Sequence, residues 1–242
     1  DTRSSTTSVP LIQTSNSNTT LTVAANGTVE GWTKSRGFDR PKEITGGTYI
    51  FHNTDWNNTS KGILGATNDK TTIASDTRIT LKGFQTGIGW GSVQIDGKVK
   101  ITNAEYGIAN FTTMNHGSEL EIHADRYIGK DCLLTYNGGH LLMIVAENGD
   151  GNNIVQGRLS IGNVSRFWYR TDENGAYTEI TVNENFENFT VAIGQNQDYL
   201  ELTDVDPDQQ ESETYDLWVA GTQVTETNQN DVLGNGTVSY DP

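Results

Sequence analysis

The sequence predicts an all-β fold, namely a right-handed parallel β-helix with coils of about 20 residues. A short phrase recurs along the middle of the chain, apolar and polar residues alternate within it, and glycine, asparagine or aspartate marks its ends. No segment has the apolar period of about 3.6 residues that a capped helix shows. Hydrophobic residues make up only 33% of the chain, which suits a solenoid whose core is one layer of side chains thick.

The recurring phrase consists of a turn residue followed by apolar residues two positions apart. It occupies residues 47–51, 76–81, 97–101, 117–122, 139–144 and 157–161. From residue 76 onward the phrases begin at 76, 97, 117, 139 and 157, so the steps are 21, 20, 22 and 18 residues. The first step, from 47 to 76, is 29 residues and leaves room for an inserted loop. A coil of a β-helix buries its apolar side chains only when its neighbours stack on it, so this period indicates stacked coils.

The alternation within each phrase predicts which side chains are buried. In the phrase 97–101, Val99 and Ile101 point one way, and Lys98 and Lys100 point the other. We expect the apolar pair to fill the interior and the lysines to meet water. The same reasoning places one residue from each of four phrases in a single interior column: Ile79, Val99, Leu120 and Leu159. An antiparallel β-sandwich, which the strand spacing also permits, is the alternative fold.

The chain divides into four predicted parts. Residues 1–20 form a flexible arm rich in serine, threonine and asparagine, and residues 21–203 form the solenoid. The solenoid opens with a cap in which strands at 21–25 and 28–30 are joined by a hairpin-type turn at Asn26 and Gly27. Residues 204–214 are an acidic linker, and residues 215–242 begin a second β module that is truncated.

The charge of the chain limits its partners. The 242 residues contain 16 lysines and arginines against 31 aspartates and glutamates, a formal net charge of −15. Such a chain repels nucleic acid and anionic lipid, and no apolar stretch is long enough for membrane insertion. The one cysteine, Cys132, is expected to be a small buried side chain, and it leaves no disulfide to stabilise the fold.

The end of the chain carries a resemblance to a known group of modules. Residues 215–225 read YDLWVAGTQVT and residues 231–242 read DVLGNGTVSYDP. This run resembles the opening of modules in large multidomain surface proteins of Gram-positive bacteria, where it leads into β-helical repeats often labelled carbohydrate-binding. The upstream solenoid resembles the pectate-lyase-like adhesive type in general architecture. The resemblance implies a secreted, cell-surface or wall-attached monomeric part of a longer chain, with a glycan or a host or bacterial surface polysaccharide as partner.

Aromatic residues are the candidates for carbohydrate binding. Sugar rings stack on exposed aromatic faces while nearby polar groups bond to their hydroxyls. One cluster of aromatic and basic residues fits this pattern, and it comprises Arg166, Phe167, Trp168, Tyr169 and Arg170. Trp90 and Trp56, each beside glycine or asparagine, are candidates for a second patch. The alternative for all of these aromatic residues is packing under long loops.

Two acidic segments are candidates for calcium, and no other cofactor is expected. Asp204, Asp206 and Asp208 alternate as ligands of a metal loop do, and Asp150 lies in a segment rich in glycine and asparagine. The segment with Asp204, Asp206 and Asp208 does not match the EF-hand pattern, and a polar linker and an ordinary turn are the alternative interpretations of the two segments. The four histidines lack the spacing of metal ligands.

Charged residues on one predicted strand raise the question of catalysis. Glu119 and Glu121 share an outer face, with Lys98 and Lys100 one coil earlier and Arg158 later. A glycoside hydrolase needs two carboxyl groups across the bond it breaks, and a polysaccharide lyase needs carboxylates and a base. A ladder of opposite charges between neighbouring coils explains the same residues. The sequence therefore favours a non-catalytic extracellular surface module that is carbohydrate-binding or adhesive. A polysaccharide lyase or glycoside hydrolase and a structural spacer are the alternatives.

Overall fold

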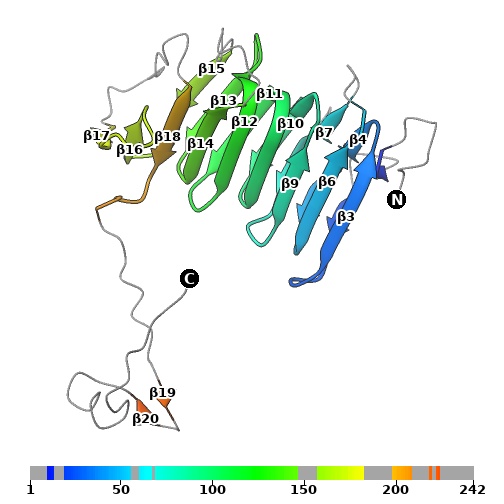
Figure 1. The fold of residues 1–242 in the computed structure, drawn as a ribbon, viewed down its shortest axis with the longest axis horizontal. Helices are drawn as coiled ribbons and strands as arrows, with labels where there is room; N and C mark the ends of the chain where they lie inside the picture. Colours follow the sequence, from blue (N-terminus) through cyan, green and yellow to red (C-terminus); the bar gives the residue numbers. More distant parts are fainter. Residues whose placement is uncertain are drawn as a thin grey trace. The chain divides into compact units, whose positions relative to one another are not determined.

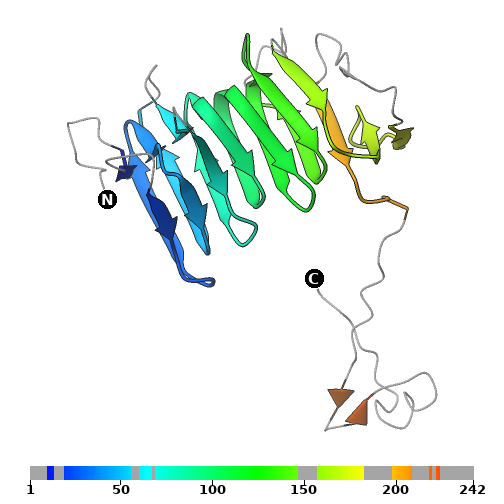
Figure 2. The same cartoon turned by 180° about the vertical axis from the view of Figure 1, so that it is seen from behind.

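The computed structural model describes residues 10–13, 19–55, 60–66, 69–146, 157–182, 198–208, 218–219 and 222–223. This part of the chain is all-β and contains no helix, so none that is long and apolar enough to cross a membrane. The first of two compact units, residues 1–207, is a β-solenoid of about six turns with coils of about 22 residues. In Figure 1 its strands follow one another along the solenoid, and Figure 2 shows them from the opposite side.

In the described residues, the coils of the solenoid build three faces of stacked strands. Face 1 contains β3 (Thr28–Thr33), β6 (Thr48–Asn53), β9 (Arg78–Lys82), the start of β11 (Lys98–Asn115), the start of β12 (Glu119–Ile128) and β14 (His140–Val145). All of these strands pair in parallel with their neighbours. The long strands β11 and β12 pass from one face to another, which is why they carry register shifts.

The other two faces are built in the same way. Face 2 contains β1 (Ile12–Gln13), β4 (Arg36–Asp39), β7 (Lys61–Leu64), the start of β10 (Thr86–Ile95), the middle of β11 and the end of β12. β1 lies within the segment expected to be a flexible arm. Face 3 contains β2 (Thr20–Thr22), β5 (Glu43–Thr45), β8 (Lys70–Ile73), the end of β10, the end of β11, β13 (Leu133–Asn137) and β15 (Arg158–Ile161).

The interior of face 1 confirms the predicted alternation. Its strands align one buried column of residues, Tyr49, Ile79, Val99, Leu120 and Leu141, each at most 2% exposed. Two positions further along, a second buried column comprises Phe51, Leu81, Ile101, Ile122 and Met143. Burial of these side chains is the main favourable contribution to the folding of a solenoid.

The prediction that Leu159 belongs to the column of Ile79, Val99 and Leu120 was wrong. Leu159 pairs with Leu134 on face 3, and Leu141 takes the expected place on face 1. The phrase 157–161 has the alternation of an inward-facing strand, but such alternation is the same on every face of a solenoid. A step of 18 residues therefore did not identify the face.

The turn at Asn26 and Gly27 is a corner of the solenoid, not a hairpin as predicted. The amide of Gly27 donates to the carbonyl of Ala24 at 2.7 Å, which closes a tight turn. The strands on either side do not pair with each other, because β2 pairs in parallel with β5 and β3 pairs in parallel with β6. The two strands thus form two faces of the first coil.

A column of glycines lets face 2 approach the interior of face 1. Gly37, Gly62, Gly87 and Gly107 occupy equivalent positions in four successive coils. A Cβ added at Gly87 would lie 2.6 Å from the Cδ1 atom of Ile101, and one at Gly107 would lie 2.4 Å from the Cγ2 atom of Ile122. The large inner side chains of face 1 therefore fill the space that side chains at these positions would need.

Asparagine side chains link successive coils at the corner between faces 3 and 1. The Asn115 amide donates to the Asp96 carboxylate at 2.5 Å, and the Asn137 amide donates to the Asn115 side-chain oxygen at 3.0 Å. The backbone amide of Asn163 continues the ladder by donating to Asn137 at 2.8 Å. These bonds satisfy polar groups that the corner would otherwise bury without partners.

Antiparallel strands cover the C-terminal edge of face 1. β18 (Tyr199–Thr203) pairs with β14, β16 (Arg166–Arg170) pairs with β18, and β17 (Thr178–Thr181) pairs with β16. The change from parallel to antiparallel pairing ends the coil repeat at this edge. In the second compact unit, residues 208–242, the described residues form one antiparallel pair, β19 (Trp218–Val219) with β20 (Thr222–Gln223).

Candidate functional site

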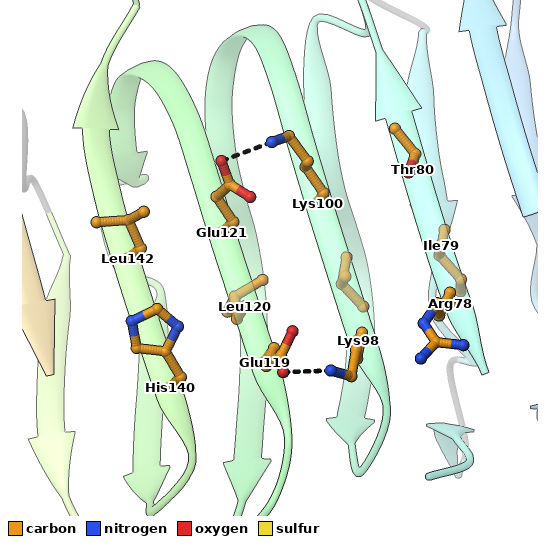
Figure 3. A pocket seen from close by; sticks show the side chains of 11 residues that line it. Arg78, Ile79, Thr80, Lys98, Lys100, Glu119, Leu120, Glu121, His140 and Leu142 are labelled. Atoms are coloured by element: carbon orange, nitrogen blue, oxygen red, sulfur yellow. Dashed lines mark hydrogen bonds and ion pairs between the residues drawn. The ribbon is translucent and has the colours of Figure 1, made fainter. Parts of the chain in front are cut away.

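A shallow hollow of about 320 Å³ lies on the outer surface of face 1 (Figure 3). Strand register aligns its outward side chains in two rows across four coils. One row is Arg78, Lys98, Glu119 and His140, and the other is Thr80, Lys100, Glu121 and Leu142. The alternation that buries the core of face 1 therefore also brings these polar groups together.

The lysines and glutamates of the hollow form the charge ladder that the sequence predicts. Lys98 pairs with Glu119, and Lys100 pairs with Glu121 at 2.8 Å, each across neighbouring coils (Figure 3). Because these side chains are partly exposed, each pair contributes about 0–1 kcal/mol. Arg158 lies on β15 of face 3, so it is not part of this group.

The ion pairs also determine the protonation of Glu121. Burial raises the pKa of this carboxyl, but hydrogen bonds from Lys100 and His123 outweigh burial and hold the pKa below its ordinary value. A glycoside hydrolase needs the opposite condition for its general acid, namely a carboxyl whose pKa is raised. The hydrogen bonds from Lys100 and His123 thus favour the ionised form of Glu121.

An exposed aromatic pair lies at the corner between faces 2 and 3. Three large apolar side chains are exposed in the described part of the chain, Trp90 by 60%, Phe111 by 55% and Val205 by 59%. Gly89 pairs with Ala109 and Ser92 pairs with Phe111, so Trp90 and Phe111 occupy the same corner on adjacent coils. Adjacent strands are about 4.8 Å apart, so the backbone positions that carry these two exposed rings lie close together.

The backbone around Trp90 is built to project its ring. Trp90 has a φ of 59° and Gly91 a φ of 66°, so two successive left-handed residues form a bulge that turns the chain at this corner. The Asn110 side chain, which is buried in the next coil, donates to the carbonyl of Trp90 at 3.2 Å. Thr112 in turn donates to Asn110 at 2.7 Å. The bulge is therefore held from below while the ring remains in solvent.

The predicted aromatic cluster around Trp168 is largely buried. Phe167 is fully buried against Tyr136, with the ring centroids 5.9 Å apart, and Trp168 is only 6% exposed. The guanidinium of Arg166 lies 4.6 Å from the centre of the Trp168 ring. Neither Phe167 nor Trp168 offers a free ring face, because β16 packs onto the end of the solenoid. Tyr169 is half-buried and packs against the core.

Arg170 belongs to a cluster around the buried carboxylate of Glu201. Glu201 accepts hydrogen bonds from Arg170 at 2.5 Å, from Tyr199 at 2.5 Å and from His140 at 2.7 Å. These donors, together with Tyr177, outweigh the effect of burial and lower the pKa of Glu201 to about 2. The cluster joins β16 and β18 to β14, so its role is to fasten the antiparallel cap to the last coil.

The remaining candidate residues do not form a described site. Trp56 and Asp150 lie outside the described residues. Asp204 accepts a hydrogen bond from His116 at 2.5 Å. In the described part of the chain, no three His, Cys, Asp or Glu side chains are grouped as metal ligands.

Of the predicted carbohydrate-binding residues that the structure describes, Trp90 and Arg166 are exposed, and Trp90 is the one with an exposed aromatic ring. Phe111 was not among the candidates; it lies on β11, close to the buried residues Thr112 and Met114. Phe111 lies an odd number of positions from the buried Met114 in the same strand, so alternation places its side chain on the opposite, outer side. This alternation is the signal that could have identified Phe111.

The fold and these surfaces define a β-solenoid with a charge ladder on one face and an exposed aromatic pair at one corner. No family model, no curated protein and no solved structure matches this chain.

Proposed function

We propose that this chain is a non-catalytic extracellular surface module that binds carbohydrate through Trp90 and Phe111. The exposure of these two rings on adjacent coils is the observation that carries the proposal. Covering a large exposed aromatic ring with a ligand removes apolar surface from water, which is favourable. Sugar rings present the flat apolar faces that stack on such rings. Neighbouring coils provide a rigid spacing between the rings, so little entropy is lost when a saccharide binds.

Further features support the extracellular and non-catalytic parts of the proposal. The paired charges of the hollow on face 1 are arranged as a ladder, and Glu121 has a lowered pKa. The polar composition, the net charge of −15 and the resemblance of residues 215–242 to openings of bacterial surface modules favour a place at a cell surface or wall. The proposal involves no bound cofactor.

A glycan array tests the proposal with the wild type, the double variant Trp90→Ala/Phe111→Ala, and Val205→Ala as a matched control. Aromatic contacts contribute about 0.5–1.5 kcal/mol each, so we expect the double variant to bind about tenfold more weakly. Val205→Ala removes an equally exposed apolar side chain elsewhere and should bind as the wild type does.

Two other results would count against the proposal. Wild-type protein that retains no glycan would favour a structural spacer. Turnover of a polysaccharide, followed by the absorbance of unsaturated product for a lyase or by new reducing ends for a hydrolase, would establish an enzyme.

A further inference from the structure

The side chain of Lys61 runs along the surface of face 2 toward Trp90. Lys61 on β7 pairs with Thr86 on β10, and Leu64 pairs with Gly89, the residue before Trp90. The Cδ and Cε atoms of Lys61 lie 3.2 and 3.4 Å from the position that a Cβ on Gly89 would take. Glycine at position 89 therefore leaves open the path along which the lysine stem reaches toward the aromatic corner.

Lys61 is a half-buried cation with no ion pair among the described residues. Its register partner in the preceding coil is Arg36, another cation. Arg36 pairs with Asp39 at 3.2 Å, and Arg40 lies 3.8 Å from the same carboxylate. Arg36 and Arg40 thus both contact Asp39, whereas Lys61 forms no ion pair with a carboxylate of the described residues.

This environment is unfavourable for the charged form of Lys61. Burial and the nearby charge of Arg36 both lower the pKa of its ammonium group. A partly desolvated charge without a counterion costs free energy, which an anionic ligand would recover. Lys98 and Lys100 in the ladder each form an ion pair with a glutamate. The ammonium group of Lys61, by contrast, forms no ion pair with a carboxylate of the described residues.

We propose that Lys61 makes this site select saccharides that carry an anionic group, with the sugar ring stacked on Trp90 and its carboxylate or sulfate bound by the Lys61 ammonium. This inference rests on the proposed function and specifies the class of its ligand. The net charge of the chain repels an acidic polymer at long range, so the selectivity must come from contact at this corner.

Three matched oligosaccharides test the inference: cellohexaose, its form oxidised to carboxylates at C6, and its 6-O-sulfated form. We expect the wild type to bind one or both acidic probes at least about tenfold more tightly than cellohexaose, since a hydrogen bond to a charged group is worth that much or more. The stronger of the two acidic probes identifies the anionic group. Binding is measured by isothermal titration calorimetry.

Variants separate the charge of Lys61 from its packing. Lys61→Met keeps the apolar stem and should remove the preference for the acidic probes over cellohexaose, and Lys61→Arg should retain the preference. Lys82→Met, an exposed lysine on face 1, is the control and should bind as the wild type does. Far-UV circular dichroism confirms that each variant is folded.

The inference would be overturned by equal binding of the neutral and acidic probes, by no binding of either acidic probe, or by an acidic preference that survives in Lys61→Met. These results differ from failure of the proposed function itself. That function fails if Trp90→Ala/Phe111→Ala keeps full glycan affinity, whereas the inference alone fails if binding depends on the rings but not on Lys61.

Discussion

At the scale of single residues, Glu201 shows how one buried carboxylate can fasten a cap. It is 7% exposed and accepts hydrogen bonds from side chains on three strands, β14, β16 and β18. Tyr177 also bonds to it, and burial together with Glu201 raises the pKa of Tyr177 to about 12. A buried charge with several donors is costly to disturb, because each donor loses its partner when the charge is removed.

The variant Glu201→Gln should destabilise the solenoid by about 1.5–3 kcal/mol at neutral pH. The folded-state pKa of Glu201, about 2, lies below the ordinary value of 4.5. Its contribution is therefore fully present above about pH 4.5 and is lost as the pH falls through about 2. Urea unfolding of wild type and variant across this range should show their difference in stability shrinking as the pH falls.

Glu179→Gln is the matched control for Glu201→Gln. Glu179 lies on β17, is half exposed and pairs with Arg166 at 3.7 Å, so its replacement should change stability by less than about 1 kcal/mol. Equal stability of Glu201→Gln and Glu179→Gln at neutral pH would contradict the role assigned to the cluster.

At the scale of strands, the spacing between faces depends on the glycine column of face 2. The phrases RGF, KGI, TGI and YGI at residues 36–38, 61–63, 86–88 and 106–108 repeat the same glycine followed by a buried apolar residue. The glycines admit Phe51, Leu81, Ile101 and Ile122 from face 1. At these four positions, large side chains of face 1 therefore pack against the backbone of face 2, and the apolar residue after each glycine is buried as well.

Replacing Gly87 with alanine should destabilise the protein by about 1–3 kcal/mol, because the added methyl group overpacks the interior. Its Cβ would lie 2.6 Å from Ile101 and 2.8 Å from the carbonyl oxygen of Gly107, which belongs to the backbone and cannot turn aside. Gly129→Ala is the control, since its Cβ would meet its nearest neighbours at 3.4–3.6 Å. Chemical denaturation of both variants measures the difference, and similar stability for both would show that the column has room to spare.

The sequence alone predicted the strands of face 1, and the reason is local. Alternation of apolar and polar residues after a turn residue identifies an inward-facing strand, and stacking at a constant period identifies its neighbours. The same pattern did not distinguish face 1 from face 3, which is why Leu159 was misplaced. The function of the glycine column was equally hidden, because each glycine depends on a side chain of another face that follows 14 to 19 residues later.

The candidate site was predicted only in part for a related reason. Trp90 could be named from its glycine neighbours, but the exposure of Phe111 depends on its position within β11. The importance of Lys61 depends on the pairing of β7 with β10, which brings its side chain close to Gly89. Phe167 and Trp168 have the composition of a binding cluster and are buried because β16 packs onto the last coils, a tertiary contact that no short pattern encodes.

At the scale of the whole molecule, the balance of charge should govern the response to salt. Because the net charge is −15, the negative charges repel one another more strongly in the compact folded state than in the unfolded chain. The exposed ion pairs of the ladder contribute little to the stability of the folded state. Raising NaCl from about 20 mM to about 500 mM should therefore raise the thermal midpoint. Circular dichroism at the β minimum follows the transition, with KCl as the control for ion-specific effects, and a midpoint that falls with salt would show that attractive pairs dominate.

The bond between Asn110 and the backbone of Trp90 has a consequence for how the protein is produced. Asn110, Phe111 and Thr112 form an acceptor triplet for N-linked glycosylation, yet the Asn110 amide is buried and already donates a hydrogen bond. An attached oligosaccharide could be added only before folding, and it would keep the coil beneath Trp90 from closing. Expression in eukaryotic secretory cells would thus yield a modified, misfolded fraction that bacterial hosts lacking this modification do not produce.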